Sequence, residues 1–167
     1  MLVDPDGRDI EPGSLNEWNN NKSNIIKEKD KLAKIKNPTA DQIDRLNSLR
    51  NTLTTMDDME NSSQMYAVKN IGGNIGNISL EENTISINYT GKTANFVHEL
   101  THAGQFECNN EAFSKVSGTI LTNDIYDEVA AYKAQYAYSP SSVYNLTSIR
   151  EGGTSFLSIT DKDGYGD

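Results

Sequence analysis

The two histidines of this chain, His98 and His102, lie four residues apart within one segment of regularly recurring apolar residues. The segment starts at Thr93 and has hydrophobic residues at positions 94, 96, 97, 100 and 103, which is typical of a helix. Residues four apart project from the same face of a helix, one turn from each other. The spacing therefore predicts a helix whose two imidazoles can reach a single metal ion at about 2.0–2.1 Å.

Glu99 completes a His-Glu-x-x-His pattern with these two histidines. It follows His98 directly, so on a helix of 3.6 residues per turn it is rotated by about 100° from that ligand. In that position it can face a water on the ion without binding the ion itself. Two other interpretations stay open: histidines that bind no metal, and a structural metal beside which Glu99 has no role in catalysis.

A second helix is predicted from Asn123 to about Tyr138, because apolar residues recur there at spacings of three and four before Pro140. Catalytic zinc sites usually have three protein ligands and a water. No third histidine exists, so an arrangement of three histidines is excluded. The candidates for the third ligand, in order of position, are Glu107, Cys108, Glu111, Asp127 and Glu128, and the last lies 26 residues after His102 on this second helix.

The pattern resembles the gluzincin metallopeptidases, a family with the zincin fold, over about residues 83–138. The resemblance implies Zn²⁺ bound by His98, His102 and Glu128, with Asp127 as the main competitor for the third position. Ala130 and Ala131 would let the two helices approach closely. It further implies hydrolysis of peptide bonds in proteins or peptides, with Glu99 as the general base.

The chain departs from that family in one respect, because thermolysin-like members use a further histidine to stabilise the oxyanion. Here the role falls to a tyrosine, to an amide or to no residue. Three tyrosines are candidates, Tyr126, Tyr132 and Tyr136. We predict Tyr132 as the catalytic one, since it lies one turn beyond Glu128.

The rest of the chain predicts an α+β, zincin-like fold in a single domain at 15–167. Residues 15–60 have the apolar spacing of a helical hairpin, which either covers a core or binds a partner; Pro38 breaks it and Thr39 caps its second helix.

Residues 61–78 are rich in Asn, Ser and Gly and predict a loop. Residues 83–90 alternate like a half-buried strand, expected at the edge of a small sheet where an extended substrate could pair with it. The motif helix and the ligand-bearing helix follow.

The first 14 residues are predicted to form a turn-rich leader, and residues 4–9 read Asp-Pro-Asp-Gly-Arg-Asp. This segment resembles the end of the core of RHS-repeat proteins, where a variable C-terminal effector domain begins. The resemblance implies a toxin domain that is secreted or delivered to a target cell as part of a larger protein, and a cognate immunity protein as a partner. No signal peptide is recognisable in this chain.

The net charge is −9 and the isoelectric point is about 4.7, which argues against binding to nucleic acid or to an anionic membrane surface. No apolar run approaches the roughly 20 residues of a membrane span. The expected function is zinc-dependent peptide hydrolysis. The alternatives are a binding module with a structural zinc and a protease that cuts only its own parent chain.

Overall fold

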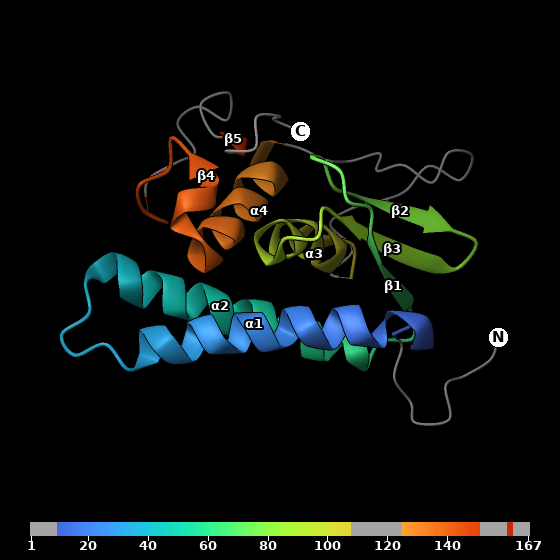
Figure 1. Ribbon diagram of the computed structural model, residues 1–167, viewed down its shortest axis with the longest axis horizontal. Coiled ribbons are helices and arrows are strands. Elements are labelled where there is room, and N and C mark those ends of the chain that lie inside the picture. Colours follow the sequence, from blue (N-terminus) through green and yellow to red (C-terminus); the bar gives the residue numbers. More distant parts are fainter. Residues whose placement is uncertain (1–9, 108–124, 151–159, 162–167) are drawn as a thin grey trace.

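Two helices form the N-terminal hairpin predicted for residues 15–60. A computed structural model describes residues 10–107, 125–150 and 160–161. Helix α1 spans Leu15–Ala33 and α2 spans Ala40–Glu60, and they lie side by side in Figure 1. Thr39 caps α2 as predicted: its side chain accepts the Gln42 N–H at 3.2 Å, and the Gln42 side chain accepts the Thr39 N–H at 2.9 Å.

The hairpin covers the core of the protein. Trp18 and Ile25 of α1 and Leu49 and Met56 of α2 are buried and belong to the same hydrophobic cluster as Phe96 of the motif helix. Trp18 also contacts Phe96 edge to face, with ring centroids 6.1 Å apart. The inner face of the hairpin is thus used for packing, and of the two roles left open by its sequence the structure supports this one.

A small mixed sheet follows the hairpin. Strand β1 spans Met65–Asn70, β2 spans Asn77–Glu81 and β3 spans Thr84–Tyr89. The strand order is β1-β3-β2, with β1 parallel and β2 antiparallel to β3. The chain is therefore α+β, as its sequence predicts.

The expectation that residues 83–90 form an edge strand is wrong, because β3 is the central strand of this sheet. The sequence prediction missed β1, whose three buried residues at 66–68 are consecutive and show no alternation. The predicted loop at 61–78 also includes the start of β2. Its middle part is correct, because residues 71–76 form the loop between β1 and β2. Since a strand pairs with each side of β3, a substrate cannot pair with β3 by strand addition.

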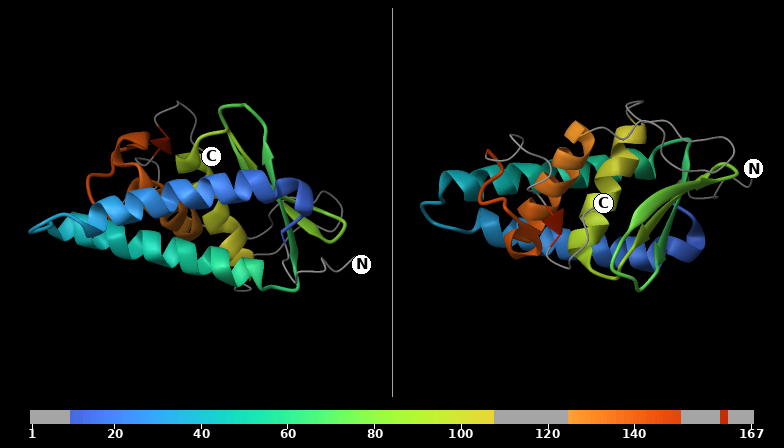
Figure 2. Two further views of the ribbon diagram at one scale, coloured as in Figure 1. Left: turned by 60° about the horizontal axis from the view of Figure 1, so that its bottom comes forward. Right: turned by 90° about the horizontal axis from the view of Figure 1, so that it is seen from above.

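Helix α3 spans Thr93–Glu107 and begins after a turn at Gly91, whose φ of +91° favours glycine. Helix α4 spans Ile125–Tyr138. Figure 2 shows α3 between the sheet and α4, with the hairpin across one face of all three. Because α3 is enclosed in this way, ten of its residues are buried, including four polar ones: Asn95, His98, Glu99 and His102.

The remaining elements are short. They are the 3₁₀ turns η1 (Pro12–Ser14) and η2 (Pro140–Ser142) and the strands β4 (Val143–Tyr144) and β5 (Thr160–Asp161). Among the helices in the described ranges, none combines the length and the apolar character needed to cross a bilayer. The segment at residues 4–9 and the residues Cys108 and Glu111 lie outside the described part of the chain.

Candidate metal centre

Helix α3 places His98 and His102 one turn apart on the face that is directed at α4. Their exposed fractions are 1% and 3%, and their ring centroids are 5.1 Å apart. Such deep burial is unusual for polar side chains and requires hydrogen-bonding partners or partners of opposite charge. The partner comes from α4.

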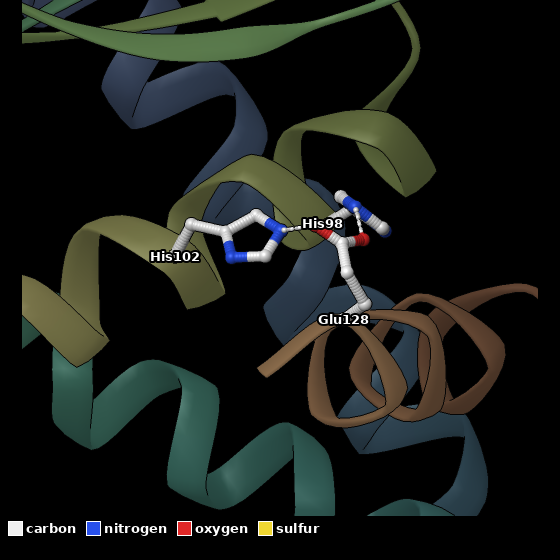
Figure 3. A group of neighbouring side chains, drawn as sticks. All are labelled: His98, His102 and Glu128. Atoms are coloured by element: carbon white, nitrogen blue, oxygen red, sulfur yellow. Dashed lines mark ion pairs between the residues drawn. The ribbon is translucent and has the colours of Figure 1, made fainter. Parts of the chain in front are cut away.

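Glu128 lies on α4 opposite the two histidines, and the three side chains converge in Figure 3. Its Oε1 is 3.2 Å from His102 Nε2, and its Oε2 is 3.5 Å from His98 Nε2. Ligands of a tetrahedral zinc at about 2.0–2.1 Å stand about 3.3–3.4 Å from each other, which is close to these separations. The potential ligand atoms of the three residues all lie within 4.8 Å of one another, so the group could hold a metal ion.

Glu107 and Asp127, the other predicted ligands within the described residues, are not part of this group. Among the described residues, the only group of three His, Cys, Asp or Glu side chains that could hold a metal is His98, His102 and Glu128. Asp127 lies beside Glu128, and its backbone carbonyl accepts a hydrogen bond from Gln105 at 3.3 Å. Glu107 accepts a hydrogen bond from the Tyr66 hydroxyl.

The environment of Glu128 favours its ionised form. Burial by itself raises the pKa of this carboxyl, but His102 and His98, when protonated, donate to it and face it with positive charge, and this outweighs burial and holds the pKa far below its usual range. The Glu128 carboxylate therefore stays ionised as long as positive charge lies next to it, as on protonated imidazoles. A bound cation would supply that charge without protonating the histidines.

Gln105 fixes the orientation of His102. Its Nε2 donates to the backbone carbonyl of Asp127, so its Oε1 is the atom that faces His102 Nδ1, at 3.0 Å. An amide oxygen can only accept, so Nδ1 carries the proton and the lone pair of the neutral ring is on Nε2, the atom that faces Glu128. The sequence analysis missed Gln105, although its position three residues after His102 places it on the neighbouring turn.

If the group binds a metal, replacing Gln105 with leucine is expected to weaken the binding of Zn²⁺, used as the probe, by about 10-fold to 100-fold, which is the usual cost of removing a partner of a metal-bound histidine. The dissociation constant is measured by competition with a chromophoric chelator. Gln64→Leu is the matched control, because Gln64 bonds to Met65 and Asn83, away from the metal centre. Equal affinity in the Gln105 variant and the wild type would contradict the orienting role.

The three candidate tyrosines lie in different surroundings. The ring of Tyr132 is 1% exposed and contacts His98 edge to face, with centroids 4.6 Å apart. Tyr136 is directed elsewhere, since its hydroxyl lies 2.9 Å from Asp41 Oδ2 and 2.6 Å from the Thr147 carbonyl. Tyr126 is 78% exposed. Tyr132 is thus the one whose ring is seen to contact a candidate ligand, and its catalytic role stays a prediction.

Glu99 is 2% exposed and lies on α3 next to the histidine face. Asn95, one turn earlier, donates to Glu99 Oε1 at 3.4 Å. The backbone of Gly76, just before β2, lies so close that a Cβ there would be 2.6 Å from the same oxygen. The site therefore consists of a buried group of three potential ligands, and Glu99 is buried on the same helix next to His98 in the sequence.

No family model matches this chain, and neither the curated proteins nor the solved structures contain a match to it.

Proposed function

We propose that this chain is a zinc-dependent peptidase. The observation that carries the proposal is the buried convergence of His98, His102 and Glu128, with Glu99 beside the first of them on the same helix. Two imidazoles and one carboxylate are a donor set that suits zinc, and three protein ligands leave a fourth position open.

The residues of the site have distinct tasks in the proposed reaction. When bound, zinc would lower the pKa of water toward about 7 and polarise a carbonyl group. Glu99 would accept the proton of the attacking water and pass it to the leaving amine. Gln105 would keep the His102 ring in place, and Tyr132 would pack against His98 and is our candidate donor to the oxyanion.

A peptide substrate is favoured by the position of β2 beside the site. This strand pairs with β3, and no second strand partner is seen for it among the described residues. Gly76, the residue before β2, approaches Glu99 closely. We propose that an extended substrate pairs with β2, so that its backbone is led past Glu99.

Proline in β2 tests this substrate platform. In an antiparallel pair, neighbouring residues alternate between those that bond to the partner strand and those whose N–H is directed away from it. Of Ser79→Pro and Leu80→Pro, one is therefore expected to destabilise the β2–β3 pair. The other should fold and raise KM about 3-fold to 10-fold, the effect of one lost hydrogen bond. Unchanged KM in both variants, each with native circular dichroism, would contradict the platform.

The function itself is tested by incubating the zinc-loaded protein with a library of proteome-derived peptides and identifying new termini by mass spectrometry. Cleavage that requires zinc is expected. If no peptide is cut, the same experiment on a longer parent chain containing residues 1–14 identifies a protease that cuts only itself. Absence of cleavage in both experiments would overturn the peptidase proposal.

A structural zinc is the second candidate function, because His98, His102 and Glu128 are almost completely buried and closed sites are typical of structural metals. Zinc would then join α3 to α4, and the domain would bind a partner. In that case metal removal would destabilise the fold, and no substrate would be hydrolysed under any condition.

For the biological setting, we propose an effector domain of an RHS-type toxin that is delivered to a target cell. The proposal rests on the sequence of residues 4–9. It predicts an upstream RHS-repeat region in the same reading frame and a neighbouring gene for a small immunity protein. Co-expression of that neighbour should relieve toxicity of the wild-type domain, and a genome lacking both features would exclude this setting.

A further inference from the structure

Asn95 is a buried amide in direct reach of Glu99. Both residues lie on α3, one turn apart, with exposed fractions of 8% and 2%. The Asn95 Nδ2 lies 3.4 Å from Glu99 Oε1, a long hydrogen bond between buried groups. The proposed function gives Asn95 no task so far.

The direction of the Asn95 amide is determined by the junction between β3 and α3. The backbone N–H of Thr90 donates to Asn95 Oδ1 at 3.0 Å. Because a backbone N–H can only donate, the atom that receives it must be the amide oxygen. The amide nitrogen is then directed at Glu99, so Asn95 offers a hydrogen to the carboxylate and cannot compete with it as an acceptor.

Gly76 limits the space on another side of the same carboxylate. A Cβ at this position would lie 2.6 Å from Glu99 Oε1, 2.6 Å from Asn95 Oδ1 and 2.8 Å from the Asn88 carbonyl. Two of these atoms belong to the Asn95–Glu99 pair, and the third is fixed backbone of β3. Only glycine therefore fits here without displacing the pair.

We propose that Asn95 is the positioning residue for Glu99, and that Gly76 keeps the carboxylate in place by close backbone contact. The inference rests on the proposed function, because the orientation matters for a carboxylate that transfers a proton. The hydrogen bonds of Asn95 go to Thr90 and Glu99, and the residue acts through Glu99. Correct orientation of the reacting group then raises turnover without altering substrate binding.

Asn95→Asp separates positioning from a purely structural role. Aspartate keeps the shape of the side chain and still accepts from Thr90 N–H, but it places a second carboxylate against Glu99. If Asn95 only ties the β3–α3 junction together, the variant should turn over like the wild type. Under the proposal, kcat falls about 10-fold to 100-fold, whereas KM and the zinc dissociation constant stay within about twofold of the wild type. Asn61→Asp at the exposed C-cap of α2 is the control for the added charge.

Gly76→Ala tests the close contact from the other side. It is expected to lower kcat with little change in zinc affinity, because the added methyl group must displace the Glu99 carboxylate or the Asn95 amide. Gly73→Ala is the matched control in the same loop, since a Cβ there meets nothing within 4 Å. Equal kcat in the two glycine variants would overturn the role of Gly76.

A measurement on the metal-free protein is independent of activity. Asn95→Ala should lower the urea midpoint of unfolding in the wild-type background and lower it less when Glu99 is already alanine, because the partner is gone. Equal shifts in both backgrounds, or wild-type kcat in Asn95→Asp, would overturn the positioning role. Absence of hydrolysis by the wild-type protein would instead overturn the proposed function, so the two failures are distinguishable.

Discussion

Replacing Glu99 with glutamine is expected to lower peptide hydrolysis by about 10²-fold to 10⁴-fold, the range that a general base contributes. Glutamine has nearly the same shape and can still accept the hydrogen from Asn95, but it cannot take up a proton from water. The fold and the zinc content should therefore stay as in the wild type. Turnover is measured on a fluorogenic peptide taken from the library screen.

Glu107→Gln is the control for this prediction, because Glu107 lies on the same helix and contacts Tyr66. It should retain wild-type turnover. Loss of activity in both variants would indicate damage to α3 in place of a specific role of Glu99. Full activity in Glu99→Gln would contradict the general base assignment directly.

Removal of the metal is expected to destabilise the protein strongly. Zinc that binds only the folded state at 1,000 times its dissociation constant adds about 4 kcal/mol to the free energy of unfolding. The expected ligands come from α3 and α4, so the apo protein lacks the metal ion that would join these helices. Glu128 then has only protonated imidazoles to balance its negative charge. Thermal unfolding with chelator, and again after addition of excess zinc, measures the effect.

The zinc-induced shift should decrease as the solution becomes acidic, because histidine must be neutral to bind metal and protons compete for the same nitrogens. His102→Ala is the control and should show no zinc-induced shift at any pH. Identical unfolding midpoints with and without zinc in the wild type at neutral pH would contradict a metal site at this position.

The elements with strong local patterns could be predicted from the sequence. The hairpin follows from apolar spacing and from the Pro38-Thr39 boundary, and α3 follows from the apolar spacing after Thr93. Glu128 was predicted from a family resemblance, and the structure places it opposite both histidines. These features depend on residues close in sequence or on a known spacing.

The arrangement of the sheet could not be predicted in the same way. The order of the strands depends on how the chain connects them in space. The alternating pattern of residues 84–89 would be the same in a central strand and in an edge strand of the sheet. Asn95 and Gln105 were missed because a polar residue on a helix usually faces solvent. Their significance comes from the packing of β3 and α4 around α3, which buries the first and gives the second its partners.

The most direct test of the account is the metal content of purified protein, with wild type, Glu128→Gln and Asp127→Asn measured side by side by mass spectrometry of bound metals. The account predicts about one zinc per chain in the wild type and in Asp127→Asn, and a large loss in Glu128→Gln, because the two histidines and Glu128 form the ligand set. A wild-type protein without zinc after reconstitution, or zinc retained in Glu128→Gln and lost in Asp127→Asn, would contradict it.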